Sequence, residues 1–155
     1  MAPPASLESG VEVTAEEAIR SRVSVKDYTS EPVPREAIER LLELAVLAPN
    51  HRMTEPWRFV RVGPQTRARL AELAVLAKGS KGPLSEEAAN RARVKVLSPP
   101  ELIVAVQIKA ADAVTEREDY AAVACAIENL SLSLWASGVG SKWSTGAVTA
   151  LPETY

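Results

Sequence analysis

The sequence predicts a mixed α and β protein in which helices outnumber strands. Apolar residues recur at helical spacing in several segments, whereas two short segments, 57–62 and 102–108, have the character of strands. Prolines and glycines separate most of these segments and mark their ends. The length of 155 residues suits one domain, and a composition of 46% hydrophobic and 25% charged residues is ordinary for a globular protein.

A first helix is expected over 15–22, because Thr14 and Glu17 have the spacing of a capping box. A second helix is expected to begin at Pro34, since proline suits the first helical position. Further helices are expected over 66–77, 85–94 and 116–138. The second helix has the clearest amphipathic pattern, with these apolar residues at helical spacing: Ile38, Leu41, Leu42, Ala45 and Val46.

The helix over 116–138 is the longest, and from Tyr120 to Trp135 it is apolar or small almost all round. A helix that is apolar on all sides is typically buried on all sides. A monomer of 155 residues is too small to surround it completely, so a subunit interface is expected to cover part of it. Cys125 lies in this run and is expected to be an inert core thiol.

The two strand-like segments differ in their patterns. Residues 57–62 alternate between large and basic side chains, which is typical of a strand with one buried face. Residues 102–108 are almost continuously apolar and predict a strand buried on both faces. Two strands make a poor sheet by themselves, so we expect the natural gene product to extend beyond Tyr155.

Charge and composition limit the expected partners and location. The net charge is −2 with interspersed acids and bases, which argues against a nucleic acid or an anionic membrane as the main partner. The first residues lack the features of a signal peptide, and a single cysteine permits no disulfide framework within the chain, so a cytoplasmic location is expected. Residues 1–13 are expected to form a flexible tail before one domain over 14–155.

The segment 48–59 links the second helix to the first strand and contains the only histidine of the chain. Its two prolines stiffen the backbone and disfavour helix at the residues before them. A core does not require an amide, an imidazole and a guanidinium in consecutive positions, so Asn50, His51 and Arg52 are candidate ligand-binding residues. The alternative, a packed or surface histidine, is equally consistent with the residues alone.

Two further clusters are candidates for binding. Arg22, Ser24 and Lys26 place two cations and a hydroxyl just past a helix end, which indicates either an anion site or a solvated turn. Near the other end of the chain, Trp143 and the residues after it either cap a helix or line a pocket. The sequence contains no glycine-rich dinucleotide fingerprint, no phosphate-loop motif and no zinc-binding spacing.

Four stretches together resemble the FMN-dependent nitroreductase family, in particular the compact bacterial branch whose loop reads Ala-Pro-Asp/Asn-His followed by Pro-Trp. The stretches occur in the order of the family and span the chain from Glu17 onward: 22–28, 31–34, 48–59 and 138–146. Val23 stands where the family usually has a second arginine, and Met53 and Glu55 stand where many members have Asn and Gln. Family members also continue for several tens of residues past the position of Tyr155, so the chain resembles a truncated member.

The resemblance implies an α+β fold with a central, mainly antiparallel sheet flanked by helices, and a homodimer with one FMN at each subunit interface. Arg22, Ser24 and Lys26, with Val23 between them, would hold the phosphate and the ribityl chain. Leu47, Asn50 and His51 would reach the flavin bound mainly by the other subunit. The remaining positions that would line the cofactor are Trp143, Ser144, Thr145 and Gly146.

The activity that the resemblance implies is transfer of a hydride from NAD(P)H to a nitroaromatic, a quinone or a similar small acceptor by a ping-pong mechanism. The sequence offers no acid–base pair, no credible nucleophile and no metal site, so the reactivity would come from the FMN. Asn50, His51 and Arg52 would tune the flavin rather than carry the chemistry. Two alternatives are a flavin-binding protein without turnover (a carrier, a regulator or a truncated relic) and a helical dimerisation domain without a ligand.

Overall fold

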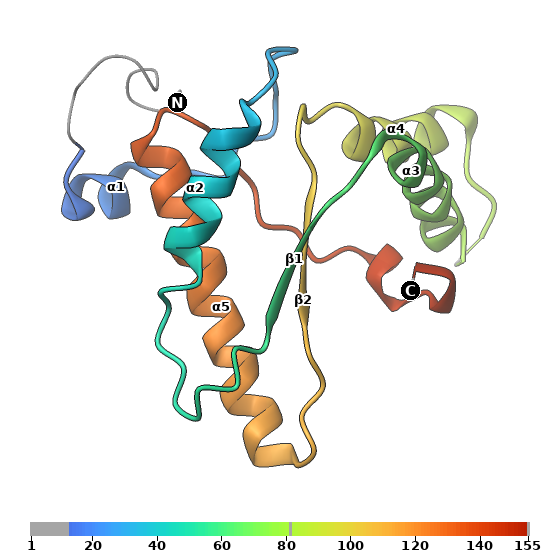
Figure 1. Cartoon of the computed structure of the whole chain (residues 1–155). Coiled ribbons are helices and arrows are strands. Elements are labelled where there is room, and N and C mark those ends of the chain that lie inside the picture. Colours follow the sequence, from blue (N-terminus) through green and yellow to red (C-terminus); the bar gives the residue numbers. More distant parts are fainter. Residues whose placement is uncertain (1–12, 81, 155) are drawn as a thin grey trace. The chain divides into compact units, whose positions relative to one another are not determined.

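The structure, a computed structural model, describes residues 13–80 and 82–154. Most of the tail expected over 1–13 therefore lies outside the described residues. The fold belongs to the α+β class, as predicted, because helices dominate and two strands pair into a small sheet (Figure 1). The described residues form two compact units, of which unit 1 contains residues 13–26, 33–60 and 105–143, and unit 2 contains residues 27–32, 61–80, 82–104 and 144–154.

Unit 1 contains three helices, α1 (Ala15–Ser21), α2 (Arg35–Ala45) and α5 (Ala113–Ala136). The predicted capping box at α1 is confirmed, since the Thr14 hydroxyl accepts the Glu17 N–H at 3.2 Å and the Glu17 carboxylate accepts the Thr14 N–H at 2.9 Å. Pro34 is the N-cap of α2 and not its first residue, because its ψ of 136° is extended. Helix α5 begins after Asp112, whose carboxylate accepts two backbone N–H groups of the first turn.

The core of unit 1 lies where α5 packs beside α2 (Figure 1). Small residues of α5 allow a close approach to α2, and Ala126 and Ala45 are both 0% exposed. The predicted apolar stripe of α2 contributes Ile38 and Leu41 to the buried set. A cluster continues from α5 toward the first strand: Ala48, Trp57, Ala122, Val123 and Ala126.

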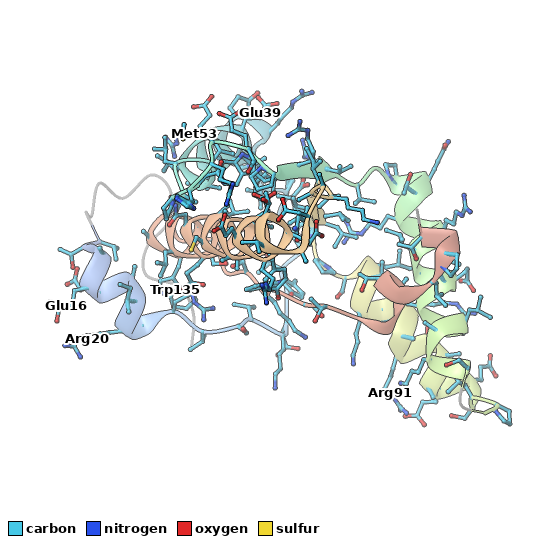
Figure 2. All side chains as sticks on the ribbon, turned by 90° about the horizontal axis from the view of Figure 1, so that it is seen from below. Glu16, Arg20, Glu39, Met53, Arg91 and Trp135 are labelled. Atoms are coloured by element: carbon cyan, nitrogen blue, oxygen red, sulfur yellow. The ribbon has the colours of Figure 1, made fainter. Side chains whose placement is uncertain are left out.

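Helix α1 is joined to the other end of α5 by one buried tryptophan. The Trp135 indole N–H donates to the Ser21 hydroxyl at 2.8 Å, and that hydroxyl donates to the Glu17 carbonyl at 2.6 Å. Trp135 is fully enclosed, whereas Glu16 and Arg20 project from the outer side of α1 (Figure 2). The hydrogen bond fixes the point at which the chain leaves α1.

The prediction that Cys125 is a core thiol is wrong, because this residue is exposed. Helix α5 is apolar almost all round, but only one of its faces packs within unit 1. Cys125 lies one helical turn after Ala121, which is also exposed. The sequence predicted that a subunit interface covers part of this helix.

Helix α5 ends in a Schellman motif at the predicted glycine. Gly138 has a φ of 78°, and its N–H donates to the Trp135 carbonyl at 3.0 Å. The Val139 N–H donates to the Leu134 carbonyl at 2.8 Å, which completes the motif. The positive φ reverses the chain direction after α5.

Unit 2 contains α3 (Pro64–Gly79), α4 (Glu86–Leu97) and two short 3-10 helices, η1 (Ala147–Ala150) and η2 (Pro152–Thr154). Helices α3 and α4 pack against each other, and η1 and η2 pack against α3. Arg67 of α3 is half-buried and donates to the carbonyls of Val96, Pro99 and Pro100. These bonds satisfy carbonyl groups at and just after the C-terminal end of α4.

The sheet consists of β1 (Trp57–Arg61) and β2 (Ile103–Gln107), which run antiparallel. Hydrogen bonds flank the pair at both ends, from the Ile108 N–H to the Pro56 carbonyl at 2.7 Å and from the Val62 N–H to the Leu102 carbonyl at 2.9 Å. The predicted positions of both strands are confirmed. The prediction that β2 is buried on both faces is wrong, because its residues are half-buried or, for Ala105, exposed.

Replacing Gly138 by alanine is expected to lower the free energy of unfolding by about 1 kcal/mol, because a β-carbon is strained at positive φ. Gly79→Ala at the end of α3 is the matched control, since its β-carbon would lie 3.8 Å from Leu84 in ordinary contact. That variant should be neutral or more stable. Urea unfolding measures both, and equal stability of Gly138→Ala and the wild type would contradict the assignment.

Candidate functional site

The segment after α1 contains the first group of candidate residues. The chain becomes extended at Arg22, whose ψ is 131°, and the next residues alternate between half-buried and exposed. Ser24 and Lys26 are exposed, whereas Val23 and Val25 are half-buried. The backbone therefore presents the hydroxyl and the ammonium group on the solvent side.

This segment lies against the loop that follows α5. The Val25 N–H donates to the Ser141 carbonyl at 3.0 Å. A β-carbon on Gly140 would lie only 2.5 Å from the Val25 Cγ2 atom, so only glycine permits this approach. As a result, two of the four stretches that carry the family resemblance are neighbours, and Lys26 and Lys142 come from adjoining segments.

The Arg22 guanidinium faces α5. Its Nε atom lies 3.8 Å from the Glu128 carboxylate, which is an ion-pair distance but too long for a hydrogen bond. The Arg22 side chain is 28% exposed and the Glu128 side chain 50% exposed, so water screens the pair. Because this ion pair holds the Arg22 guanidinium only weakly, the guanidinium remains available to bind another anion.

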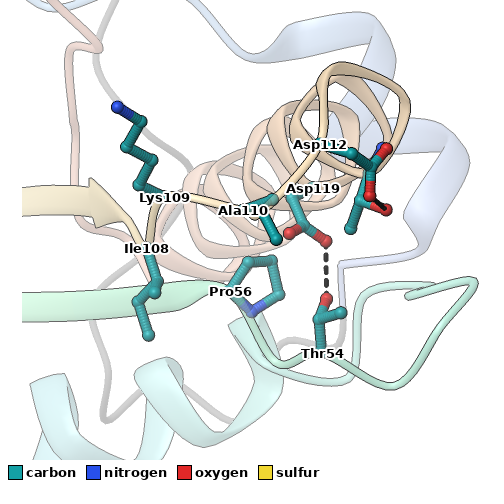
Figure 3. A pocket seen from close by; sticks show the side chains of 9 residues that line it. Thr54, Pro56, Ile108, Lys109, Ala110, Asp112 and Asp119 are labelled. Atoms are coloured by element: carbon teal, nitrogen blue, oxygen red, sulfur yellow. Dashed lines mark hydrogen bonds between the residues drawn. The ribbon is translucent and has the colours of Figure 1, made fainter.

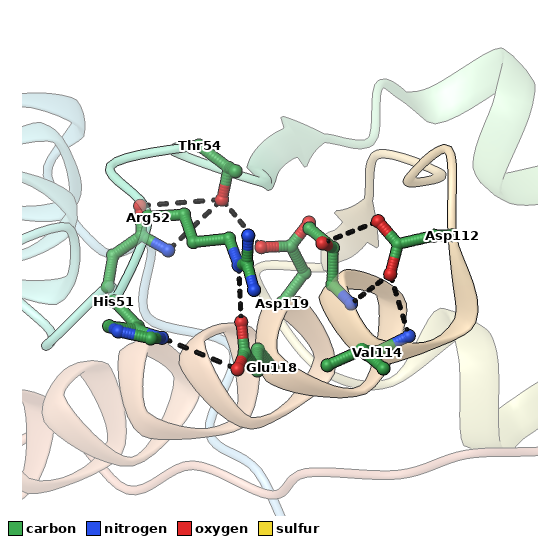
Figure 4. Close-up of polar contacts among 9 residues, drawn as sticks. His51, Arg52, Thr54, Asp112, Val114, Glu118 and Asp119 are labelled. Atoms are coloured by element: carbon green, nitrogen blue, oxygen red, sulfur yellow. Dashed lines mark hydrogen bonds and ion pairs between the residues drawn. The ribbon is translucent and has the colours of Figure 1, made fainter.

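The loop after α2 contains the second group, and α5 holds it by charge. Glu118 contacts two successive residues of the loop, with the Arg52 Nε at 2.8 Å and the His51 Nδ1 at 3.3 Å (Figure 4). The hydrogen bond from Arg52 lowers the pKa of Glu118 below its usual 4.5, and His51 adds a smaller effect. The His51 side chain remains 75% exposed, and the ring nitrogen that contacts Glu118 is Nδ1, not Nε2.

A second set of hydrogen bonds holds the same loop from its inner side. The Thr54 hydroxyl donates to the buried carboxylate of Asp119 at 2.5 Å, and Asn50 Nδ2 lies 3.1 Å from that hydroxyl (Figure 4). Asn50 Oδ1 accepts the Glu55 N–H at 2.8 Å. These hydrogen bonds hold the loop in place. They do so although Met53 and Glu55 have positive φ values of 52° and 46°, which are unfavourable for residues with a side chain.

A cavity of about 330 Å³ lies beside this network in unit 1 (Figure 3). It opens between the end of the loop, the segment after β2 and the first turns of α5. Its lining includes the Thr54 and Asp119 side chains that form the hydrogen bond. The full lining comprises Thr54, Pro56, Ile108, Lys109, Ala110, Ala111, Asp112, Thr115 and Asp119.

The other predicted site residues are exposed. Leu47 is 75% exposed and Trp143 is 47% exposed, so both are accessible to a ligand or a second subunit. Ser144, Thr145 and Gly146 are exposed and belong to unit 2. The hydrogen bonds and ion pairs of Asn50, His51 and Arg52 lead to their own loop and to α5.

The sequence reasoning missed Glu118 and Asp119. A signal for Asp119 was present, because it precedes Ala122, Ala126 and Leu130 at helical spacing and so lies on the buried face of α5. Among the described residues, no group of three potential metal ligands occurs, and no helix in the part of the chain covered by the structure could cross a bilayer.

Comparison with known proteins identifies the class to which this fold and site belong. Residues 19–150 match the Nitroreductase family, so the chain is a member of that family. The Bacillus subtilis protein named "Putative NAD(P)H nitroreductase YfhC" is 36% identical over 132 residues, which cover 84% of this chain and 68% of that protein.

Solved structures agree with this assignment. A nitroreductase-like family protein from Bacillus cereus is similar with a TM-score of 0.76 and 28% identity, over 92% of this chain and 75% of the other. The FMN-dependent nitroreductase NfnB from Mycobacterium smegmatis, solved in complex with NADPH, has a TM-score of 0.63 at 20% identity, over 81% and 72% of the two chains. At 20% identity, the similarity to NfnB concerns the fold alone.

Replacing Glu118 by glutamine is expected to destabilise the protein at neutral pH. Because the folded state lowers the pKa of Glu118, its contribution is complete above pH 4.5 and is lost as the pH falls through the lower, folded-state pKa. The difference between the two proteins in urea midpoint should therefore be present at pH 7 and vanish in acid. Glu39→Gln, which removes an exposed pair with Arg35, is the control and should have little effect at either pH. A pH-independent difference for Glu118→Gln would contradict the charge-based anchor.

Proposed function

We propose that this chain is an FMN-dependent oxidoreductase that takes a hydride from NAD(P)H and passes it to a nitroaromatic, a quinone or a similar small acceptor. Membership of the nitroreductase family supports the class of reaction. The Bacillus subtilis relative, named a putative NAD(P)H nitroreductase and 36% identical, supports NAD(P)H as the hydride donor. A bound flavin supplies the ability to accept a hydride and release it again.

The observation that carries this proposal is the contact between Val25 and the loop at Gly140 and Ser141. It places the segment that contains Arg22, Ser24 and Lys26 beside the segment that contains Lys142, so the adjoining segments offer a guanidinium, a hydroxyl and two ammonium groups. Such donors fit the phosphate and ribityl chain of FMN, because charge-assisted hydrogen bonds to phosphate are among the strong ones. The donor set is therefore chemically suited to the cofactor.

The loop at Asn50 and His51 supplies the second part of the proposed site. We assign it to the flavin held mainly by a second copy of the chain, together with Leu47. Large apolar side chains in unit 1 support a homodimer, since Leu47 is 75% exposed and Tyr120 of α5 is 62% exposed. Trp143, Ser144, Thr145 and Gly146 complete the proposed cofactor-binding set.

The residues of this loop differ in what they offer to the flavin. Arg52 is already paired with Glu118 at 2.8 Å, so we propose that it orients the loop. His51 has one ring nitrogen near Glu118 and most of its side chain in solvent, which makes it the better candidate for contact with the ring. We assign no proton transfer or covalent step to either residue.

Arg22→Ala is expected to weaken FMN binding by about tenfold or more, because one charged contact to the phosphate is lost. Arg20→Ala is the matched control, since Arg20 pairs only with Glu16 on the exposed side of α1 among the described residues. Quenching of FMN fluorescence on binding measures both affinities. Unchanged affinity in Arg22→Ala would remove this residue from the site.

Steady-state kinetics test the reaction. Donor and acceptor would use the same open face of the site and must therefore bind in turn, so double-reciprocal plots at several acceptor concentrations should be parallel. Intersecting lines would refute the shared site. FMN binding without NAD(P)H oxidation would instead support the alternative of a flavin-binding protein without turnover.

A further inference from the structure

The buried face of α5 contains one feature that packing does not require. Asp119 is 3% exposed and is the only charged side chain among the described residues that is buried. The next residues along the same face, Ala122, Val123 and Ala126, are small and apolar. Burial of a carboxylate is unfavourable unless it is hydrogen-bonded, and an apolar residue of similar size often packs as well.

The partner of Asp119 fixes the direction of a chain of hydrogen bonds. The Thr54 hydroxyl has one proton, which it donates to Asp119 across 2.5 Å. The hydroxyl oxygen is then an acceptor for the Asn50 Nδ2 group at 3.1 Å. Asn50 must therefore turn its Oδ1 atom toward the Glu55 N–H, where the distance is 2.8 Å.

This chain of hydrogen bonds encloses the strained part of the loop. Met53 and Glu55 both have positive φ, which costs roughly 1–2 kcal/mol for each residue with a side chain. Such backbone persists only where surrounding contacts hold it in place. Beside the backbone hydrogen bond from the Met53 N–H to the Asn50 carbonyl at 3.3 Å, the side-chain contacts of this stretch lead from Asn50 through Thr54 to Asp119.

We propose that Asp119 is a positioning residue that acts through the Thr54 hydroxyl to fix the loop on which Asn50 and His51 meet the flavin. The proposal rests on the proposed function. The neighbouring Glu118 holds His51 and Arg52 from the solvent side, and Asp119 holds Asn50 from the inner side. Two successive carboxylates of α5 thus determine the orientation of the loop.

The test uses the full chain with and without FMN. Asp119→Leu and Thr54→Val each remove the central hydrogen bond and keep the number of side-chain heavy atoms, and Thr54→Ser keeps the hydroxyl. Because the chain has one histidine, the ring Hε1 resonance of His51 reports on the loop in the flavin-free protein. FMN affinity from fluorescence quenching is the second readout, and circular dichroism establishes that each variant folds.

Asp119→Leu and Thr54→Val should each shift the His51 resonance and weaken FMN binding by about tenfold. The double variant should be no weaker than either single variant, because both remove the same hydrogen bond. Thr54→Ser should match the wild type. Ser131→Ala is the control, since among the described residues its buried hydroxyl bonds only to the Ile127 carbonyl. Ser131 lies about 18 Å beyond Asp119 along α5.

The outcomes separate the two claims. If the wild type binds FMN and both Asp119→Leu and Thr54→Val match it in affinity and in the His51 resonance, the positioning role is wrong and the proposed function stands. The role is also wrong if Thr54→Ser behaves like Thr54→Val. If the folded wild type binds no FMN, the proposed function is wrong, and the positioning role at a flavin site falls with it.

Discussion

The packing of one face of α5 within unit 1 is the constraint on which both groups of candidate residues depend. Ala126 lies in the buried cluster, and Trp135 ties the C-terminal half of the helix to α1 through Ser21. Near its N-terminal end α5 holds the loop at Asn50 and His51 through two carboxylates. After its C-terminal end the positive φ of Gly138 leads the chain to the contact between Gly140 and Val25.

Different interactions stabilise the arrangement at the two ends of α5. At the C-terminal end the arrangement rests on shape, since a glycine without a β-carbon permits a backbone contact with Val25. At the N-terminal end it rests on polar interactions that hold two residues with positive φ. A buried carboxylate and strained backbone are unfavourable for stability alone, so their combination at one loop supports the proposed positioning role of Asp119.

Local patterns made most of the elements predictable from the sequence. The capping box at Thr14, the stripe of α2 and the glycine at the end of α5 each depend on residues close in sequence. The prediction for Cys125 failed because composition does not indicate which face of an apolar helix packs within the chain. The roles of Glu118 and Asp119 depend on contacts with residues more than sixty positions away, which periodicity does not encode.

Native mass spectrometry of the full chain with added FMN tests the central claim most directly, because it measures subunit number and cofactor number together. The account predicts a dimer that carries two FMN molecules, as each of the two sites would use residues from both chains. A folded monomer, or a dimer that retains no FMN, would contradict it.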